Sequence, residues 1–154
     1  MTVTTPARPS TAARRVGYLA AASINAVLLY LIAVSPGWQA VPFLTDDTTR
    51  VLGLVELSVV VGVFCNLLYT VADPLWLRAS GALVTTAVGL VVLTRLWQVF
   101  PFEFDERGVD WAWWIRLALV VGVVGSVIGL IAHTVNLVRA CAAHRPEHRP
   151  RRLP

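Results

Sequence analysis

The chain has 154 residues, of which 56% are hydrophobic and 14% are charged, and its mean hydropathy is +0.68. Soluble domains carry about 25% charged residues, so this composition excludes an ordinary water-soluble globule. The net charge of +4 does not indicate nucleic-acid binding, because the arginines are sorted along the chain and form no single basic face. We therefore expect an integral membrane protein with no nucleic-acid partner.

Four segments are long and apolar enough to cross the bilayer as helices, which takes roughly 20 residues each. The spans cover about residues 16–36, 51–72, 75–100 and 111–137. None of them alternates with the period of two that marks a barrel strand. Because the connections are short, consecutive spans should pack as antiparallel neighbours. The sequence predicts an all-α transmembrane domain over residues 16–138, with four helices in an up-down-up-down bundle.

The first span has to be distinguished from a signal peptide, because Arg14 and Arg15 precede it and residues 33–35 resemble a cleavage site. Its apolar run exceeds the usual 7–15 residues of a signal peptide. Pro36 would also lie directly after the cut. We therefore expect the first span to be retained as a transmembrane helix.

The two ends of the chain are rich in Pro, Thr and Arg and are expected to be disordered. Residues 1–15 form a basic N-terminal tail in this interpretation, and residues 139–154 form an Arg-rich C-terminal tail. Each Arg close to the membrane contributes about 1 kcal/mol of attraction to anionic lipids. The spacing of Cys141, His144 and His148 completes no four-ligand pattern, so we expect no metal site.

The arginines near the ends of the spans predict the orientation of the protein. The two tails and the second connection hold nine arginines and two acidic residues, a net charge of +7. The first and third connections hold two arginines and six acidic residues, a net charge of −4. Because basic residues favour the cytoplasmic side, we expect a multi-pass protein of the cytoplasmic membrane with both termini inside.

Small residues recur at helical spacing and indicate the faces where helices approach closely. Those on the third and fourth spans are Gly81, Gly89, Gly122, Gly125, Ser126 and Gly129. The pattern is compatible with packing inside the bundle, which we favour, and with a homo-oligomer interface.

Three ionisable residues, Glu56, Arg95 and Arg116, lie at similar depth a few residues inside the outer ends of their spans, with Gln98 one turn above Arg95. Such residues cost about 2.5–3.5 kcal/mol each at the centre of a span, so they are rare there. We predict that Glu56 is ionised and pairs with Arg95, Arg116 or both. The cluster can serve as a structural ion pair, which we favour, or as an outward-facing site for an anion or a carboxylate ligand.

A second belt of polar residues lies nearer the cytoplasmic side and includes Asn25, Asn66, His133 and Asn136. His133 follows Gly129 by four residues, so it should face the interior of the bundle. The expected role is hydrogen bonding between helices, worth about 0.6–2 kcal/mol for each bond. A haem held by two histidines would need a second intramembrane His, which this chain lacks.

Catalytic motifs are not recognisable in the sequence. It has no Cys pair in the outer connections, no HExxH and no Gly-rich phosphate loop. The acidic residues of the outer connections have no His beside them that could complete a hydrolase site. We therefore expect a non-enzymatic protein without a cofactor.

Two segments, residues 37–44 and residues 95–104 (RLWQVFPFEF), resemble small four-span membrane proteins of actinobacteria. The resemblance covers about residues 16–140, and RLWQVFPFEF, where the third span leaves the membrane, is its most specific part. It implies the same four-span architecture and no known activity, and no functional residue is carried over from it.

The leading hypothesis is an accessory, scaffold or partner-binding subunit in the cytoplasmic membrane. Its partners would be the bilayer and a second membrane protein or another copy of this chain. The alternative is a small transporter or channel that uses Glu56, Arg95 and Arg116 as its outer site. Gly or Pro breaks near the middle of spans usually mark transport sites, and no Pro interrupts a span here, so the first hypothesis is favoured.

Overall fold

The structure is a computed structural model that describes residues 10–104 and 110–143. Over these residues the chain forms four long α-helices: α1 (Thr11–Ala33), α2 (Thr49–Val71), α3 (Leu75–Val99) and α4 (Trp111–Ala143). Each of them is long and apolar enough to cross a membrane. The predicted all-helical class and the four membrane-spanning candidates are therefore confirmed for the described residues.

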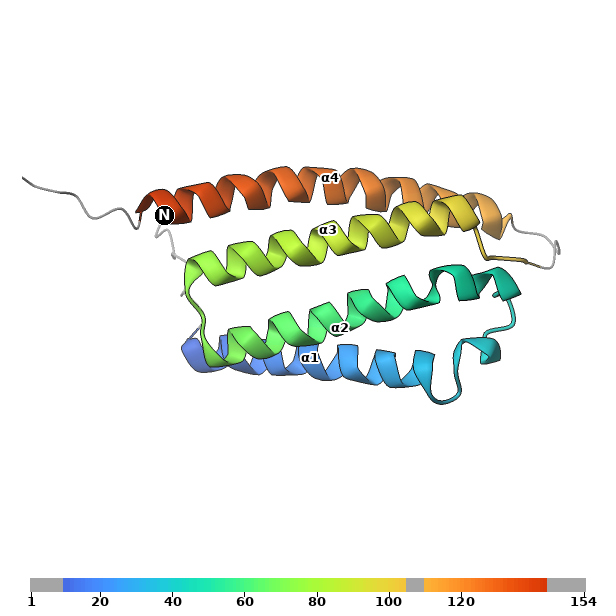
Figure 1. Cartoon of the computed structure of the whole chain (residues 1–154), viewed down its shortest axis with the longest axis horizontal. Helices are drawn as coiled ribbons and strands as arrows, with labels where there is room; N and C mark the ends of the chain where they lie inside the picture. Colours follow the sequence, from blue (N-terminus) through green and yellow to red (C-terminus); the bar gives the residue numbers. More distant parts are fainter. Residues whose placement is uncertain (1–9, 105–109, 144–154) are drawn as a thin grey trace, which may run out of the picture.

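The helices lie side by side in chain order, as a row (Figure 1). α1 packs on α2, α2 on α3, and α3 on α4, and the central pair packs less extensively than the other two. No comparable contact joins α1 to α4 within the described residues, so the row does not close into a ring. The protein thus consists of two helix hairpins, α1–α2 and α3–α4, and the bundle is open between its first and last helix.

The first helix begins earlier than the sequence predicted. The hydroxyl of Ser10 accepts a 3.2 Å hydrogen bond from the backbone N–H of Ala13, which satisfies a free N–H group at the helix start. Residues 11–15 are therefore helical and do not belong to a disordered tail. α4 likewise continues past the predicted end of its span, to Ala143. The rest of the two predicted tails lies outside the described residues.

The α1–α2 connection packs against the segment that follows α3. It contains two short 3-10 helices, η1 (Trp38–Ala40) and η2 (Asp46–Thr48). Leu44 and Phe102 form an isolated antiparallel bridge, and beside it the backbone N–H of Glu103 donates to the carbonyl oxygen of Phe43 at 3.0 Å. These contacts join the two hairpins at the end of the row opposite to the α2–α3 connection (Figure 1).

α3 ends because Phe100, the residue that follows its last residue, precedes a proline. Phe100 has the left-handed angles φ +43° and ψ 65°, and Pro101 after it is fully buried. A proline disfavours the helical conformation in the preceding residue, so the helix cannot continue through Phe100. The chain turns there toward the α1–α2 connection, and the carbonyl oxygen of Pro101 accepts a 3.1 Å hydrogen bond from the backbone N–H of Thr45.

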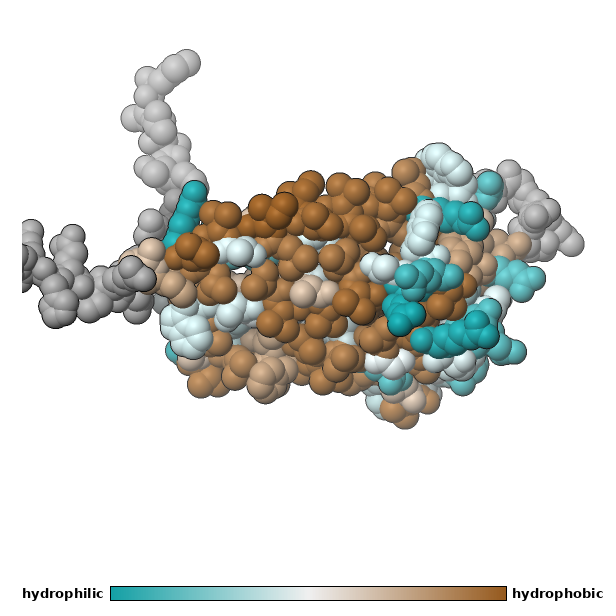
Figure 2. Space-filling view, turned by 45° about the horizontal axis from the view of Figure 1, so that its top comes forward, coloured by the Kyte–Doolittle hydropathy of each residue, from teal (hydrophilic) through white to brown (hydrophobic). Residues whose placement is uncertain are grey.

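Most of the apolar surface of the helices is exposed in the isolated chain. The buried apolar side chains of the described helices are Ala22, Val51, Cys65 and Leu119. On the face shown in Figure 2, hydrophobic residues cover the middle of the row and hydrophilic residues gather mainly at the end with the α1–α2 connection. Lipid tails can cover such a surface, because they are as apolar as the side chains they touch.

The predicted packing residues of α3 and α4 differ in their surroundings. A Cβ atom at Gly122 or Gly129 would lie 3.1 Å or 3.5 Å from an α3 side chain, so these glycines lie where the two helices approach. A Cβ atom at Gly89 or Gly125 would meet nothing within 4 Å, and Ser126 is partly exposed. The close approach of α3 and α4 therefore uses part of the small-residue pattern, since Gly89 and Gly125 have open space beside them.

Gly81 of α3 provides a test of the contact between the hairpins. A Cβ atom there would clash with the hydroxyl of Tyr69 on α2. We predict that Gly81→Ala lowers the free energy of unfolding by about 1–3 kcal/mol, because the Tyr69 ring must move. The control Gly89→Ala has room for its methyl group and should be neutral or stabilising, since Ala favours helix. Circular dichroism in detergent measures both variants, and equal stability would contradict the Gly81–Tyr69 contact.

Candidate functional site

A cluster of polar side chains surrounds Asp73, in the short connection between α2 and α3. Asp73 Oδ2 accepts a 3.0 Å hydrogen bond from Arg14 Nε, and Oδ1 accepts one of 3.2 Å from the hydroxyl of Tyr18. Arg78 Nε lies 3.4 Å from the same Oδ1 atom. The Asp73 side chain is 13% exposed, so two guanidinium groups compensate a carboxylate that has little access to water. The cluster links the start of α1 to the start of α3.

Two tyrosines extend this cluster to α2. The rings of Tyr18 and Tyr69 meet edge to face, with 5.4 Å between their centroids. Such pairs contribute about 0.5–1.5 kcal/mol beyond the area that they bury. The hydroxyl of Tyr69 donates a long hydrogen bond of 3.5 Å to the backbone carbonyl oxygen of Arg78. Three helices therefore meet through polar and aromatic contacts at this end of the row.

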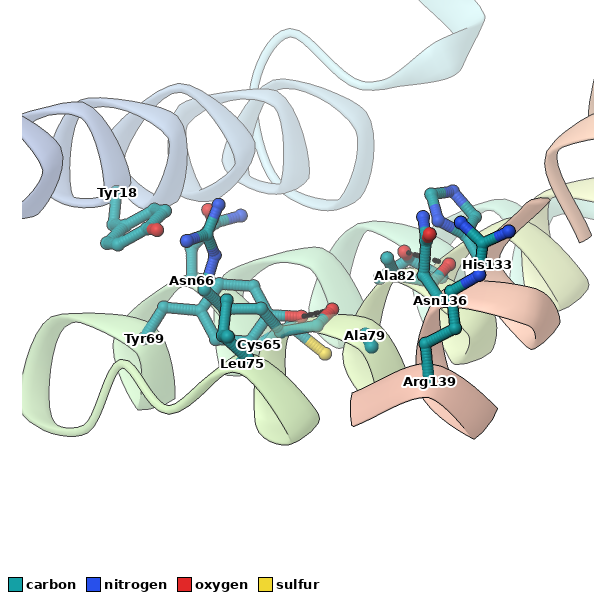
Figure 3. Close-up of a pocket in the computed structure, with 12 residues that line it drawn as sticks. Tyr18, Cys65, Asn66, Tyr69, Leu75, Ala79, Ala82, His133, Asn136 and Arg139 are labelled. Atoms are coloured by element: carbon teal, nitrogen blue, oxygen red, sulfur yellow. Dashed lines mark hydrogen bonds between the residues drawn. The ribbon is translucent and has the colours of Figure 1, made fainter. Parts of the chain in front are cut away.

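Beside the Asp73 cluster, all four helices line a cavity of about 740 Å³, which we call the polar groove (Figure 3). Its volume falls within the range of about 300–1,000 Å³ that is typical of small-molecule sites. The groove is lined by Tyr18 of α1, by Cys65, Asn66 and Tyr69 of α2, by Leu75, Arg78, Ala79, Ala82 and Thr85 of α3, and by His133, Asn136 and Arg139 of α4.

α4 presents three hydrogen-bonding side chains to the polar groove. His133, Asn136 and Arg139 follow one another at a spacing of three residues, which places them on one face of the helix. Figure 3 shows them together on one side of the groove, with Tyr18 and Asn66 on the other. Within residues 10–104 and 110–143, none of these three α4 side chains makes a hydrogen bond or an ion pair. α4 thus carries hydrogen-bonding capacity that the described chain does not use.

The other members of the predicted inner belt lie between α1 and α2. The amide of Asn66 donates to the carbonyl oxygen of Gly62, one turn earlier in its own helix, at 2.8 Å. Asn25 of α1 packs against the same glycine, since a Cβ atom at Gly62 would lie 2.8 Å from Asn25 Nδ2. The hydroxyl of Thr85 also bonds to its own helix, at the Gly81 carbonyl oxygen. The predicted hydrogen bonds between helices are therefore not formed by the described belt residues. Asn66 bonds within its own helix instead, because an Asn side chain readily reaches a backbone carbonyl one turn away.

The predicted outer ion pair is not assembled in the part of the chain that the structure describes. Glu56 of α2 forms no ion pair there. Arg95 of α3 donates instead from Nη1 to Oε1 of Gln98, one turn on in the same helix, at 3.3 Å. The guanidinium carbon of Arg116 lies 4.6 Å from the centroid of the Phe100 ring, a cation–π contact.

The open row explains why Glu56 does not pair with Arg116. α2 and α4 are separated by α3, so Glu56 and Arg116 lie on helices that are not neighbours. Arg95 and Arg116 are both exposed, which allows their long side chains to reach partners near the ends of the helices. A similar depth along two spans therefore does not bring two side chains together across the bundle.

The polar side chains that line the polar groove can interact with anions and form hydrogen bonds. Arg78 and Arg139 can attract anions, and His133 and Asn136 can donate or accept hydrogen bonds. Across the described residues, no three His, Cys, Asp or Glu side chains come together as metal ligands would. The arrangement is suited to recognising a polar or anionic group inside an apolar frame.

Sequence reasoning missed the role of Asp73, although one signal was available. Asp73 is one of two acidic residues among the nine arginines of the tails and the second connection. An isolated acid in a basic environment at the end of a span is a candidate for an ion pair. Its partners could not be named, because Arg14 lies 59 residues away in the sequence.

The Asp73 cluster predicts a stability effect. Asp73→Asn removes the negative charge between Arg14 and Arg78, and we expect a loss of about 1–3 kcal/mol in the free energy of unfolding. The control Asp47→Asn breaks an exposed pair with Arg50 and should change stability by less than about 1 kcal/mol. Thermal unfolding in detergent measures both variants, and a loss in Asp73→Asn no larger than in the control would refute the structural role of this carboxylate.

The chain matches no protein-family model, no curated protein and no solved structure. Its function has to be inferred from the polar groove and its surroundings.

Proposed function

We propose that this chain is a non-enzymatic, multi-pass protein of the cytoplasmic membrane that serves as a partner-binding subunit. Its four helices run alternately across the bilayer, and both termini lie in the cytoplasm. The partner is a transmembrane helix of another membrane protein, which lies along the polar groove.

The unused hydrogen-bonding face of α4 carries this proposal. His133, Asn136 and Arg139 face a groove that residues 10–104 and 110–143 leave open. Uncompensated polar groups are unfavourable inside a membrane, and in membrane proteins they face other protein segments or water-filled cavities. A partner helix with polar or acidic side chains would pair these groups and cover the apolar walls beside them.

The orientation is supported by where the arginines lie in the fold. Arg14, Arg78 and Arg139 all lie at the end of the row that carries the α2–α3 connection. The opposite end carries Asp46, Asp47 and other acidic residues. The positive-inside rule places the arginine-rich end, and with it the polar groove, on the cytoplasmic side.

The alternative of a transporter with an outer site receives less support. The outer site of the transporter hypothesis consists of Glu56, Arg95 and Arg116, and these side chains do not form ion pairs with one another in the described residues. Arg95 and Arg116 each contact a side chain near the end of α3 instead. Glu56 is left on the far side of α3 from Arg116. The geometry therefore favours partner binding at the polar groove.

The orientation can be tested with a native thiol. Cys141 is exposed near the end of α4, whereas Cys65 is buried. We expect a membrane-impermeant maleimide to leave Cys141 unmodified in intact cells and to label it after permeabilisation. In a Cys141→Ser background, Glu103→Cys should react in intact cells, because Glu103 is exposed at the opposite end of the row. The reverse labelling pattern would overturn the orientation.

Partner binding can be tested by photocrosslinking in native membranes. A benzoylphenylalanine residue at position 136 faces the polar groove, and one at position 138 is a control at nearly the same depth that does not line it. We expect position 136 to yield a crosslinked product whose mass exceeds that of the chain by the mass of a second polypeptide. Position 138 should yield no such product. His133→Leu should reduce the adduct at position 136, because the helix loses a hydrogen-bonding site.

Two results would count against a heterologous partner. Equal adducts at positions 136 and 138 would show that the groove is not the preferred surface. An adduct of twice the mass of the chain would show that a second copy of this protein covers the groove.

A further inference from the structure

The two arginines that line the polar groove, Arg78 and Arg139, lie at the ends of membrane-spanning segments. The span formed by α3 begins at Leu75, three residues before Arg78, and the span formed by α4 ends at Arg139 itself. Because a span covers the hydrocarbon core of the bilayer, its ends lie where the lipid headgroups begin. The mouth of the groove therefore lies at the level of the lipid phosphates, on whichever side of the membrane it faces.

From this mouth the polar groove extends along the helices toward the middle of the spans. Its α3 wall runs from Leu75 through Ala79 and Ala82 to Thr85. Leu75 and Thr85 are ten residues apart, which corresponds to about 15 Å along the helix axis. Leu75 is 72% exposed, so the wall is open to its surroundings at the mouth. A molecule with a polar head and a hydrocarbon chain fits this shape, with its head at the mouth and its chain along α3.

The mouth carries positive charge that the described chain does not neutralise. Arg78 shares the carboxylate of Asp73 with Arg14, so two positive charges and one negative charge leave a net charge of +1. Arg139 is exposed, forms no ion pair with the described residues and adds a second positive charge. No Asp or Glu is among the described residues that line the groove. A ligand that is negatively charged at this level would therefore be attracted.

The same side chains have the hydrogen-bond donors that a phosphate group needs. A guanidinium group carries five N–H donors and can bind two phosphate oxygens at once. Arg78 directs Nε toward Asp73, which leaves its two terminal nitrogens for another partner. Figure 3 shows Arg139 beside Asn136, whose side-chain amide is a further donor. Donors from both α3 and α4 therefore line one cavity.

The cavity at the opposite end of the row provides a contrast. It has a volume of about 380 Å³ and is formed by the end of α1, the α1–α2 connection, the start of α2 and the end of α3. None of the described residues that line it is ionisable, so an anionic headgroup there would have no counter-charge. Of these two cavities, the polar groove alone offers charge complementarity to an anion.

We propose that the polar groove binds an anionic phospholipid, with its phosphate group at the mouth between Arg78 and Arg139 and one acyl chain along the α3 wall. Basic pockets between transmembrane helices are typical sites for anionic headgroups. Such a site is more specific than the general attraction of the arginine-rich tails to the membrane surface. It lies in the same groove as the proposed partner helix and does not depend on that helix. Because both ligands would pair with Arg139, the lipid and the partner helix compete for the groove.

Native mass spectrometry of the purified full chain in mild detergent tests this proposal. The chain is titrated with phosphatidylglycerol and, separately, with phosphatidylcholine that has the same acyl chains. Both lipids contain a phosphate group, but the choline cation cancels its charge. We expect phosphatidylglycerol to bind at least 5-fold more tightly. Inorganic phosphate at the same concentration should not displace it, and equal displacement by inorganic phosphate would show that the groove binds a free anion and would overturn the lipid proposal.

Arg139→Gln removes one charge from the mouth without breaking a contact with the described residues. We expect this variant to bind phosphatidylglycerol roughly 5-fold more weakly, since an arginine near the membrane surface contributes about 1 kcal/mol toward anionic lipid. Binding of phosphatidylcholine should change less. Arg15→Gln is the matched control, because Arg15 is exposed at the same end of the row and does not line the groove. It should bind both lipids as the native chain does.

The position of the lipid is tested with a photoreactive phosphatidylglycerol that carries a diazirine on an acyl chain. We expect its crosslinks to fall within residues 75–85 and 133–139. The proposal is overturned if the two lipids bind the native chain equally, if Arg139→Gln and Arg15→Gln weaken binding to the same extent, or if the crosslinks fall outside these ranges. These outcomes do not affect the partner helix, because the purified chain is used alone here, whereas crosslinking to a partner polypeptide from position 136 is measured in native membranes.

Discussion

The carboxylate of Asp73 is the interaction on which the arrangement of the two hairpins depends. Its side chain has little exposure, and a carboxylate in such a place needs opposite charges beside it. Arg14 supplies one charge from α1 and Arg78 supplies the other from α3. Because the two arginines lie on different helices, compensating one carboxylate brings the start of α1 beside the start of α3. The edge-to-face pair of Tyr18 and Tyr69 then fills the space between α1 and α2.

An open row of helices leaves space between its hairpins, and the two ends use that space differently. At the Asp73 end the helices present guanidinium, imidazole and amide groups to the polar groove. At the other end the wall is almost entirely hydrocarbon, with Thr48 as its polar exception. A cavity selects its occupant through the groups that remain unpaired on its wall. The two ends of the described chain therefore differ in chemistry: one cavity is lined by groups that can carry charge or form hydrogen bonds, and the other is lined mainly by apolar groups.

Intramembrane polar residues in this chain follow two rules. Short side chains such as those of Asn66 and Thr85 bond to carbonyl oxygens of their own helix, which satisfies them without any neighbour. Long side chains such as that of Arg116 reach along the helix to a group near its end. His133 and Asn136 follow neither rule in the described structure. This difference distinguishes residues that are satisfied within their own helix from residues whose hydrogen-bonding groups are unused in the described structure.

The sequence by itself determined the helical class, the four spans and their approximate limits, because each of these depends on local hydropathy and length. It also predicted that His133 faces the interior of the bundle, since spacing along one helix fixes side-chain direction. The tertiary structure alone decided which side chains meet across helices: Asp73 with Arg14, and not Glu56 with Arg116. Hydropathy specifies how deep a residue lies in the membrane. The distance between two residues on different helices depends on which helices are neighbours and how each is rotated, and no local pattern in the chain encodes that.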